Sequence, residues 1–369
     1  MTRFTSKVCT MILVLFVALI GCKRDGNDPK NPKGNGENSQ TEAKDLLIEE
    51  VYYFGNYHIG RTENEIKANK PAGWKEGSEP RYNKYIKITN PTKKELSLDG
   101  MGLALTLYTP DNNPEFSKAI PATVYNDSLA ISKLYLFPKG NSKNTLKPGE
   151  SRIIATSAIN PVEKEKKYAE EWEQKELDFR ALLDLTKADY ELNNDNPQVP
   201  DLEPFFDLTS FIEGDYDPDY FSAFDISRST GIALVRLATT SEEMMKEIKA
   251  IAPSDKTVDK KGKYTRPVAY NKAHSDYSEY AWAVFIPNKW ITDFVVICAK
   301  DNRKWVINAK LDKGCNSISQ RVADEKNPDF NIWGKHEGKA ICRKNDGKKL
   351  VDTNDSGLDF EVKKASMVK

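Results

Sequence analysis

Histidine is the side chain that most often serves as a general base or a metal ligand near neutral pH, and this sequence has only three. His58, His274 and His336 are far apart along the chain, and none lies in an H-E-x-x-H motif. The sequence also lacks a G-x-S-x-G nucleophile elbow and a G-x-x-x-x-G-K-[ST] phosphate loop. Because no residues stand at a catalytic spacing, we expect a protein that is not an enzyme.

Two acidic segments carry oxygen donors at spacings that hard cations use. Asp215, Asp217 and Asp219 place three carboxylates at alternate positions, as calcium loops do. The segment 352–357 has donors at its first, third and fifth positions and glycine at its sixth, but Lys363 stands where an EF-hand has its bidentate glutamate. Solvated turns are the alternative for both segments. We therefore expect no cofactor, with calcium as the candidate metal and Asp215, Asp217 and Asp219 as its first candidate site.

Aromatic side chains in long loops are the candidates for binding. Segments 55–82 and 253–280 are rich in polar and turn-forming residues, and long loops on a β-rich scaffold are uncommon unless they have a function. Tyr57, His58 and Trp74 lie in the first loop, where amphipathic rings could stack on a sugar or contact a protein. Tolerated decoration is the alternative. We expect a partner to touch one or both loops, with Trp74 as the first contact candidate.

The amino end predicts export. Arg3 and Lys7 precede an apolar run over residues 8–21, which is too short for the roughly 20 residues that span a bilayer and suits a signal peptide. The run ends in Leu19-Ile20-Gly21-Cys22, which resembles a bacterial lipobox. The resemblance implies that residues 1–21 are removed and that Cys22 is acylated. Several acyl chains anchor a protein durably, whereas one is marginal.

The segment after Cys22 predicts a disordered tether over residues 22–45. Residues 23–44 contain a single apolar residue, Ala43, so the segment cannot bury enough surface to offset its chain entropy. Lys23 rather than aspartate follows the lipobox, which favours the outer membrane. The run Lys23-Arg24-Asp25 also resembles the surface-export signals of Bacteroidetes lipoproteins, and this resemblance implies the cell surface rather than the periplasmic face.

Composition bounds the function classes. The 369 residues are 39% hydrophobic and 10% aromatic, which excludes a polytopic membrane protein and a fully disordered chain. The 55 basic residues balance the 55 acidic ones, so the sequence offers no electrostatic argument for binding nucleic acid. After export Cys298, Cys315 and Cys342 remain, which permits one disulfide with one cysteine left over. The spacing leaves the pairing open.

The texture from residue 46 onward is that of short β-strands separated by Pro, Gly, Asn and Asp, which predicts an antiparallel sandwich. The predicted strands are 46–54, 84–89, 103–108, 133–137, 151–156, 232–237, 282–286, 294–299 and 340–343. Asn160 and Pro161 followed by apolar residues at helical spacing predict a helix over about 161–184. A shorter helix is predicted to begin at the cap Ser241, to use Met244, Met245 and Ile248, and to stop before Pro253.

Several segments together resemble the lamin-tail type of immunoglobulin-like domain. They are 47–51, 85–92, 96–100, 146–150 and 352–360, which match a strand ending in E-V, a Y-I-x-L-x-N strand, an L-x-G turn, an L-x-P-G turn and a closing D-T…D-F element. More narrowly, segments 195–200, 286–291, 311–314 and 343–344 make the chain resemble a lamin-tail-related family of unknown function in Bacteroidetes lipoproteins. Lys87 departs from the pattern, where glutamate is usual.

This resemblance implies an immunoglobulin-like, mainly β sandwich over residues 46–366 with a helical insertion at about 161–184. It transfers no catalytic residues. It implies a non-catalytic binding or accessory module, held at the outer membrane by its lipid and working beside an outer-membrane transporter or another envelope protein. The alternatives are a hydrolase acting on glycans or peptides, with acids assembled from loops, and a structural or adhesion protein of the envelope.

Overall fold

The computed structural model divides the chain into two compact units, residues 1–39 and 40–369. The structure describes the following residues: 43–53, 58–59, 61–70, 75–76, 83–111, 126–171, 173–179, 182–207, 224–249, 264–269, 280–318, 338–347 and 349–367. All of them belong to the second unit. Within these ranges no helix is both long enough and apolar enough to cross a bilayer.

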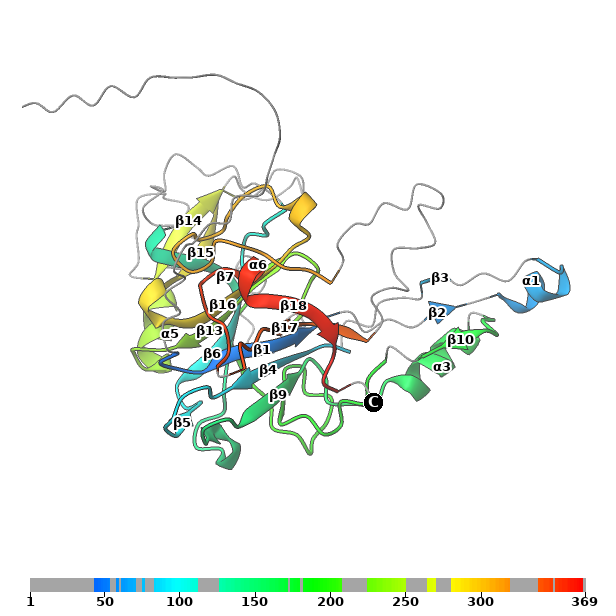
Figure 1. Cartoon of the computed structure of the whole chain (residues 1–369), viewed down its shortest axis with the longest axis horizontal. Coiled ribbons are helices and arrows are strands. Elements are labelled where there is room, and N and C mark those ends of the chain that lie inside the picture. Colours follow the sequence, from blue (N-terminus) through cyan, green and yellow to red (C-terminus); the bar gives the residue numbers. More distant parts are fainter. Residues whose placement is uncertain are drawn as a thin grey trace, which may run out of the picture. The chain divides into compact units, whose positions relative to one another are not determined.

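The first large sheet has six strands in the order β11-β9-β4-β1-β17-β18 (Figure 1). Its strands are β1 (Leu47–Tyr52), β4 (Tyr85–Thr89), β9 (Ser151–Ala155), β11 (Tyr190–Glu191), β17 (Lys339–Arg343) and β18 (Phe360–Lys364). Neighbours are antiparallel except β11 and β9, which run parallel. The first strand of the domain thus lies between strands from both halves of the chain, which makes the sheet dependent on long-range contacts.

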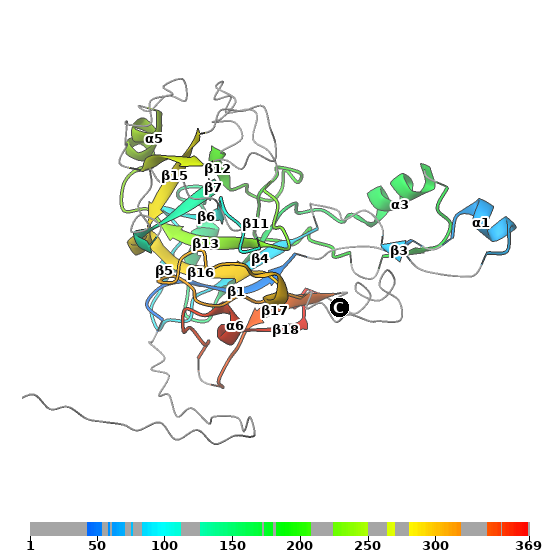
Figure 2. The same ribbon diagram turned by 90° about the horizontal axis from the view of Figure 1, so that it is seen from above.

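The second large sheet has the order β14-β15-β7-β6-β13-β16, and β12 pairs with β7 outside this path (Figure 2). Its strands are β6 (Met101–Thr106), β7 (Ser128–Leu136), β12 (Glu203–Asp207), β13 (Thr230–Arg236), β14 (Thr265–Ala269), β15 (Tyr280–Pro287) and β16 (Ile291–Ile297). All of its pairs are antiparallel. A separate pair joins β5 (Leu96–Ser97) to β8 (Thr145–Leu146).

The two large sheets share one hydrophobic core. Alternate residues of the first sheet, such as Ile86 and Ile88, pack in one cluster with Leu103, Leu105 and Val295 of the second. A second cluster covers the other face of the second sheet and includes Met244 and Ile248 of helix α5 (Ser241–Lys249). A third, smaller cluster covers part of the outer face of the first sheet. The protein is mainly β, as predicted, because alternating side chains make each strand two-sided.

The nine predicted strands are all present, with ends that differ by a few residues. The predicted helix over 161–184 is shorter than expected, because α3 spans only Val162–Glu171. Glu173 has φ +57°, a left-handed conformation that ends a helix. Leu182 and Leu183, assigned to the helical stripe, are instead buried near the first sheet. Apolar spacing alone did not distinguish a continuous helix from a helix followed by an extended segment.

The short helix at 241–249 is confirmed, and Met244 and Ile248 are its buried residues. Its capping hydroxyl belongs to Thr240, whose Oγ1 accepts a hydrogen bond from the Glu243 N–H at 3.1 Å. The prediction placed the cap one residue later, at Ser241. Both residues can cap a helix, so sequence alone does not separate them.

The segment 55–82, predicted to be an irregular loop, contains regular structure. It holds β2 (His58–Ile59), α1 (Glu63–Lys67) and β3 (Lys75–Glu76), and β2 pairs with both β3 and β10 (Leu177–Asp178). Thr62 and Glu65 form a reciprocal capping box at the start of α1. This signal is visible in the sequence as T-x-x-E, so the loop prediction missed it.

Strand register shows which segments leave the sheets together. In the first sheet Tyr85 pairs with both Tyr52 and Ala155, so residues 53–84 and the chain after β9 start from the same end. In the second sheet β13 begins at Thr230, opposite Ile297, the last residue of β16. A hydrogen bond from Lys84 Nζ to the Ile226 carbonyl (3.0 Å) brings these two ends together.

The second predicted binding loop, 253–280, also contains regular structure, because β14 (Thr265–Ala269) and the first residue of β15, Tyr280, lie within it. Residues 55–82 start from the end that carries Tyr52 and Tyr85. Val284 pairs with Ile131, close to the Thr106 end of β6, and Tyr280 lies four residues further toward the other end. The anchors of segment 270–279 therefore face away from those of 55–82. Thr265 pairs with Val284, so the part of the second loop that precedes β14 leads to the same end as 55–82, and only 270–279 starts from the other end.

Candidate functional site

A cavity of about 700 Å³ lies at the end of the two sheets where Lys84 meets Ile226. Its walls are polar, and the lining residues are Lys84, Thr109, Asp111, Asp225, Ser227, Arg228 and Ser229. They come from three separate connections: the residue before β4, the residues after β6 and the residues before β13. Ligand sites commonly form at such places, because loops there are held by a rigid scaffold.

Backbone and side-chain hydrogen bonds fix these connections. The Gly231 N–H donates to Thr106 Oγ1 at 2.9 Å, which joins the segment entering β13 to the segment leaving β6. Trp305 Nε1 donates to the Thr109 carbonyl at 2.8 Å. The Ser227 hydroxyl donates to the Ser229 carbonyl at 2.7 Å. The cavity wall is therefore preorganised rather than assembled from independent loops.

Lys84 supplies a buried cation to the cavity. Its side chain is only 2% exposed, and its Nζ lies 2.8 Å from Asp225 Oδ1. The same Nζ donates to the Ile226 carbonyl, while the Lys84 N–H donates to Thr156 Oγ1 at 3.2 Å. A buried ammonium is tolerated only when paired, so Asp225 and the carbonyl hold it in place. With Asp111 and Arg228 on the same wall, the cavity presents groups of both signs.

A buried tyrosine lies beside this site. Tyr53 Oη is 3.1 Å from Ser317 Oγ and accepts a hydrogen bond from the Ile318 N–H at 2.7 Å. Burial raises the pKa of Tyr53 to about 12, although those hydrogen bonds and the positive charge of Arg228 oppose the rise. The phenol therefore stays neutral and acts as a fixed hydrogen-bonding group, not as a base. The site has the features of a binding pocket for polar groups.

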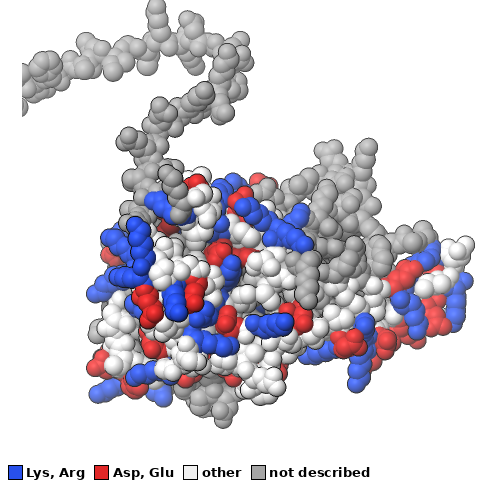
Figure 3. All heavy atoms as spheres, turned by 60° about the horizontal axis from the view of Figure 1, so that its bottom comes forward, with Lys and Arg blue, Asp and Glu red and all other residues white. Residues whose placement is uncertain are grey.

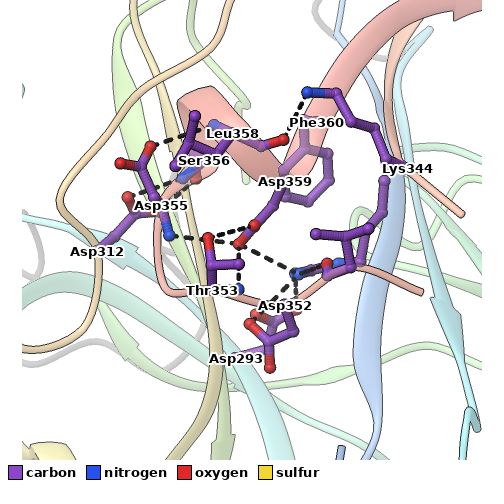
Figure 4. A network of polar contacts seen from close by, with 12 residues as sticks. Asp293, Asp312, Lys344, Asp352, Thr353, Asp355, Ser356, Leu358, Asp359 and Phe360 are labelled. Atoms are coloured by element: carbon purple, nitrogen blue, oxygen red, sulfur yellow. Dashed lines mark hydrogen bonds and ion pairs between the residues drawn. The ribbon is translucent and has the colours of Figure 1, made fainter. Parts of the chain in front are cut away.

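A second polar cluster lies elsewhere, around the buried Arg343. Figure 4 shows its carboxylates, among them Asp293, Asp352 and Asp359. The Arg343 guanidinium donates to Asp293 Oδ2 at 2.6 Å, to the Ile48 carbonyl at 2.8 Å and to the Val351 carbonyl at 3.0 Å. It also lies 4.6 Å from the centre of the Phe360 ring. These contacts join β1, β16, β17 and β18, so this cluster holds the last two strands, β17 and β18, against β1.

The carboxylates of the second calcium candidate, 352–357, belong to this cluster and accept hydrogen bonds from the protein itself. Asp355 caps helix α6 (Ser356–Asp359) by accepting from the Gly357 N–H at 2.9 Å. Asp312 accepts from the Ser356 N–H at 2.9 Å and from the Ser356 hydroxyl. Asp352 lies 3.5 Å from Arg343 Nη1. Among the described residues no group of three or more His, Cys, Asp or Glu side chains is placed to hold a metal ion.

Comparison with known proteins places the chain in a family. Residues 147–367, more than half of the chain, match the profile of a family described as "Protein of unknown function (DUF4876)". The chain belongs to the DUF4876 family. The matched range of this DUF4876 protein includes Asp225 to Ser229 of the cavity and all of the Arg343 cluster except Ile48, but not Lys84, Thr109 or Asp111.

A solved structure shares the fold. The DUF4876 protein is similar to a crystal structure of a DUF4876 family protein from Bacteroides thetaiotaomicron VPI-5482, with a TM-score of 0.53 and 18% sequence identity. The match covers 86% of this chain and 71% of the other. No curated protein matches the sequence. The similarity supports the mainly β fold and, at this identity, nothing about activity.

Most of the predicted site residues lie outside the described residues. These are Cys22, Tyr57, Trp74 and the calcium candidates Asp215, Asp217 and Asp219. His58 is described through its backbone, which pairs with Glu76 and Asp178 in the small sheet. These assignments stay predictions.

Sequence reasoning missed the cavity residues. The run Asp225-Ile226-Ser227-Arg228-Ser229 stands directly before a strongly apolar strand, and such a polar run was a usable signal for a functional loop. Lys84 was assigned only as the start of a strand. Nothing in the sequence shows that these two segments meet, because 140 residues lie between Lys84 and Asp225 in the chain.

Proposed function

We propose that this DUF4876 protein is an outer-membrane lipoprotein, anchored through Cys22, that acts as a non-catalytic binding module for a polar ligand beside an outer-membrane transporter or another envelope protein. The observation that carries the binding role is the polar cavity between Lys84, Asp111 and Arg228. A lipid anchor and the tether over 22–45 would hold this cavity near the membrane surface, on the outside of the cell.

The fold proposal accompanies this function. We propose that the two packed sheets are an immunoglobulin-like sandwich of the lamin-tail type. In support, the resembling segments coincide with β1, β4, the turn at Pro148-Gly149 and the closing α6–β18 element. Gly149 has φ +78°, the left-handed conformation that such a turn requires.

The anchor can be tested with a matched pair of cysteine variants. Cys22→Ala should leave the protein unprocessed or soluble and without acyl label, because the lipid is attached to that thiol. Cys9→Ala changes a cysteine of the same leader outside the lipobox and should behave as wild type. Membrane fractionation and radiolabelled palmitate report both properties. Unchanged acylation of Cys22→Ala would disprove the anchor.

The cavity can be tested by a charge change inside and outside it. Asp111→Asn removes a carboxylate from the cavity wall, and Asp127→Asn makes the same change in an exposed ion pair with Lys310. Thermal-shift measurements would use a panel of amino acids, dipeptides and simple sugars. A compound held by Asp111 should bind about 10-fold more weakly or worse to Asp111→Asn, the loss of one charge-assisted hydrogen bond, and normally to Asp127→Asn.

Equal binding by both variants would place the ligand elsewhere. Recovery of a transporter with the detergent-solubilised lipoprotein would support the accessory role, whereas a cell-wall or appendage partner would favour the structural or adhesion alternative. This pull-down would use the Cys22-anchored protein from the native membrane, so that the partner is captured at its natural abundance.

A hydrolase is the second candidate, and one observation favours it. The carboxyl groups of Asp201 and Glu191 are hydrogen-bonded, and burial, followed by the charge of Glu191, raises the pKa of Asp201 to about 6. A carboxyl acid tuned toward neutrality can act as a general acid. Glu191, however, accepts hydrogen bonds from the Ala158 and Asn196 N–H groups (2.7 Å each), so its carboxylate has a structural role in holding these two segments together. Asp201→Asn should abolish any glycan or peptide hydrolysis if this candidate is right.

A further inference from the structure

Two cysteines that are 17 positions apart lie side by side at the cavity end of the second sheet. Cys298 directly follows β16 and donates its N–H to the Asn316 carbonyl at 3.0 Å. The Asn316 N–H donates to the Val296 carbonyl at 3.0 Å, so Ile297 and Asn316 form a parallel bridge. Because side chains alternate along extended backbone, Cys298 and Cys315 both point to the face opposite Ile297.

The two thiols are near neighbours. Both side chains are buried in the cluster on the outer face of the second sheet, and each thiol is the strongest influence on the pKa of the other. The Cys298 thiol donates its one proton to the neighbouring carbonyl, that of Ala299, at 3.3 Å.

The third cysteine is on the other side of the molecule. Cys342 lies on β17 of the first sheet and packs at the edge of the third cluster, with Tyr52 and Tyr85. The shared core and both sheets stand between Cys342 and the other two. Packed sheets are about 10 Å apart, whereas disulfides need Cα atoms within about 4.4–6.8 Å. Cys342 cannot pair with either partner in the folded protein.

The environment also sets which thiol reacts first. The neighbouring Cys298 thiol lowers the pKa of Cys315 to about 7, against the effect of burial, and the charges of Arg303 and Lys300 assist. The Cys315 thiol, together with burial, raises the pKa of Cys298. Cys315 is therefore the more readily ionised thiol of the pair. Because both thiols are buried in the folded protein, an oxidoreductase reaches Cys315 only before residues 299–318 have packed onto the sheet.

We propose that Cys298 and Cys315 form an intramolecular disulfide when the chain reaches the cell envelope, while Cys342 stays a thiol. The proposal rests on the export part of the proposed function. The Cys315 thiolate attacks the disulfide of an envelope thiol–disulfide oxidoreductase and forms a mixed disulfide, which releases one thiolate of that enzyme. Cys298, after losing its proton, attacks Cys315 Sγ and releases the second. The two cysteines give up two protons and two electrons, and the oxidoreductase becomes a dithiol.

The bond would brace the candidate site. It closes the segment 299–314 into a loop and fixes the start of residues 316–318, where Ser317 and Ile318 hold Tyr53. The Ser229 side chain, which lines the cavity, lies beside the Cys298 thiol. The disulfide therefore stands directly behind one cavity wall.

Thiol trapping on the full-length protein tests the pairing. Cells of the native host are quenched with acid, and the protein is alkylated with N-ethylmaleimide in denaturant so that buried thiols react too. The lipoprotein is then isolated, digested without reduction and mapped by mass spectrometry. We expect a linked pair of peptides carrying Cys298 and Cys315, and maleimide on Cys342 alone. Maleimide on both Cys298 and Cys315, or a bond that includes Cys342, would overturn the proposal.

Matched variants sharpen the result. Cys342→Ser should keep the linked peptides and lose the maleimide label. Cys298→Ser and Cys315→Ser should each lose the linked peptides and label the cysteine left behind. A Cys315→Ser protein in which Cys298 links to Cys342 would overturn the assignment of the two faces.

A parallel experiment separates this proposal from the export proposal. The purified, reduced full chain is treated with oxidised glutathione, and the same linked peptides are sought. A bond between Cys298 and Cys315 both in the membrane and in this buffer supports the pairing. A bond in the buffer alone means that the chain does not reach an oxidising compartment, which overturns the step in the envelope. Free thiols in both experiments overturn the pairing itself.

Discussion

The buried Arg343–Asp293 pair offers a quantitative test of what holds β17 against β1 and against β16 of the second sheet. Arg343 has a side chain that is 1% exposed, and its Nη2 lies 2.6 Å from Asp293 Oδ2. The same oxygen accepts the Ile48 N–H at 2.6 Å, so the pair connects β16 and β17 to β1. Arg343→Met keeps much of the side-chain volume but leaves the buried Asp293 carboxylate without its cation.

The expected cost follows from burial. Removing one partner of a buried ion pair destabilises a protein by about 3–5 kcal/mol, and Arg343→Met should fall in this range. Asp293→Asn should cost less, about 2–3 kcal/mol, because Arg343 keeps the carbonyls of Ile48 and Val351 and the nearby Asp359. The double variant leaves no carboxylate at Asp293 to be unpaired, so its loss should be smaller than the sum of the single losses by about 2 kcal/mol.

Urea unfolding followed by tryptophan fluorescence would measure these free energies of unfolding. With a urea m-value of about 3 kcal/mol/M, Arg343→Met should lower the unfolding midpoint by about 1–1.7 M. Arg152→Met is the control, because Arg152 lies at a partly exposed rim and donates mainly to backbone carbonyls. A loss below about 1 kcal/mol for Arg343→Met, or strict additivity in the double variant, would refute the reasoning.

Three further predictions concern single residues. Burial raises the pKa of Asp312 to about 7 from 3.8, so between these pH values the folded state holds a proton that the unfolded state releases, and stability should fall as pH rises from about 4 to 7. Asp312→Asn, whose amide can donate to the Ser356 hydroxyl, should flatten this pH dependence of stability in urea titrations. An unchanged slope would contradict the prediction. Gly102→Ala would place a methyl group 2.5 Å from the Tyr135 carbonyl oxygen and should cost about 1–3 kcal/mol in thermal or urea unfolding, so a neutral result would contradict the close approach of β6 and β7. Glu173 has φ +57°, a left-handed conformation that costs a residue with a side chain about 1 kcal/mol relative to glycine. Glu173→Gly should therefore stabilise the end of α3 and slow its amide hydrogen exchange, and faster exchange would contradict this.

The surface adds a reason not to expect charge-driven binding. Positive and negative side chains are interspersed over the face shown in Figure 3. This pattern accords with the equal numbers of basic and acidic residues. Recognition by this protein should therefore depend on local geometry, as at the cavity, rather than on long-range steering, and should change little with salt.

The sequence by itself determined the class of fold and the position of the strands. Alternation such as Tyr85-Ile86-Lys87-Ile88 specifies a strand locally, because each residue's face depends only on its neighbours. The same holds for α5, whose Met244 and Ile248 are one helical turn apart, and for the turns at Gly100, Gly140 and Gly149, which all have positive φ. Local rules failed after Glu171, because Glu173 is left-handed and Leu183 packs in the cluster on the first sheet rather than on a helix.

Tertiary structure alone decided the pairings between distant segments. Nothing local in Lys84 and Asp225 indicates an ion pair, and the partners of Arg343 follow from the order of strands in the sheets. That order is set by how many apolar side chains the shared core can bury, a property of the whole chain and not of any window of it. The sequence therefore identified the strands, and the packing of the strands chose which polar residues meet.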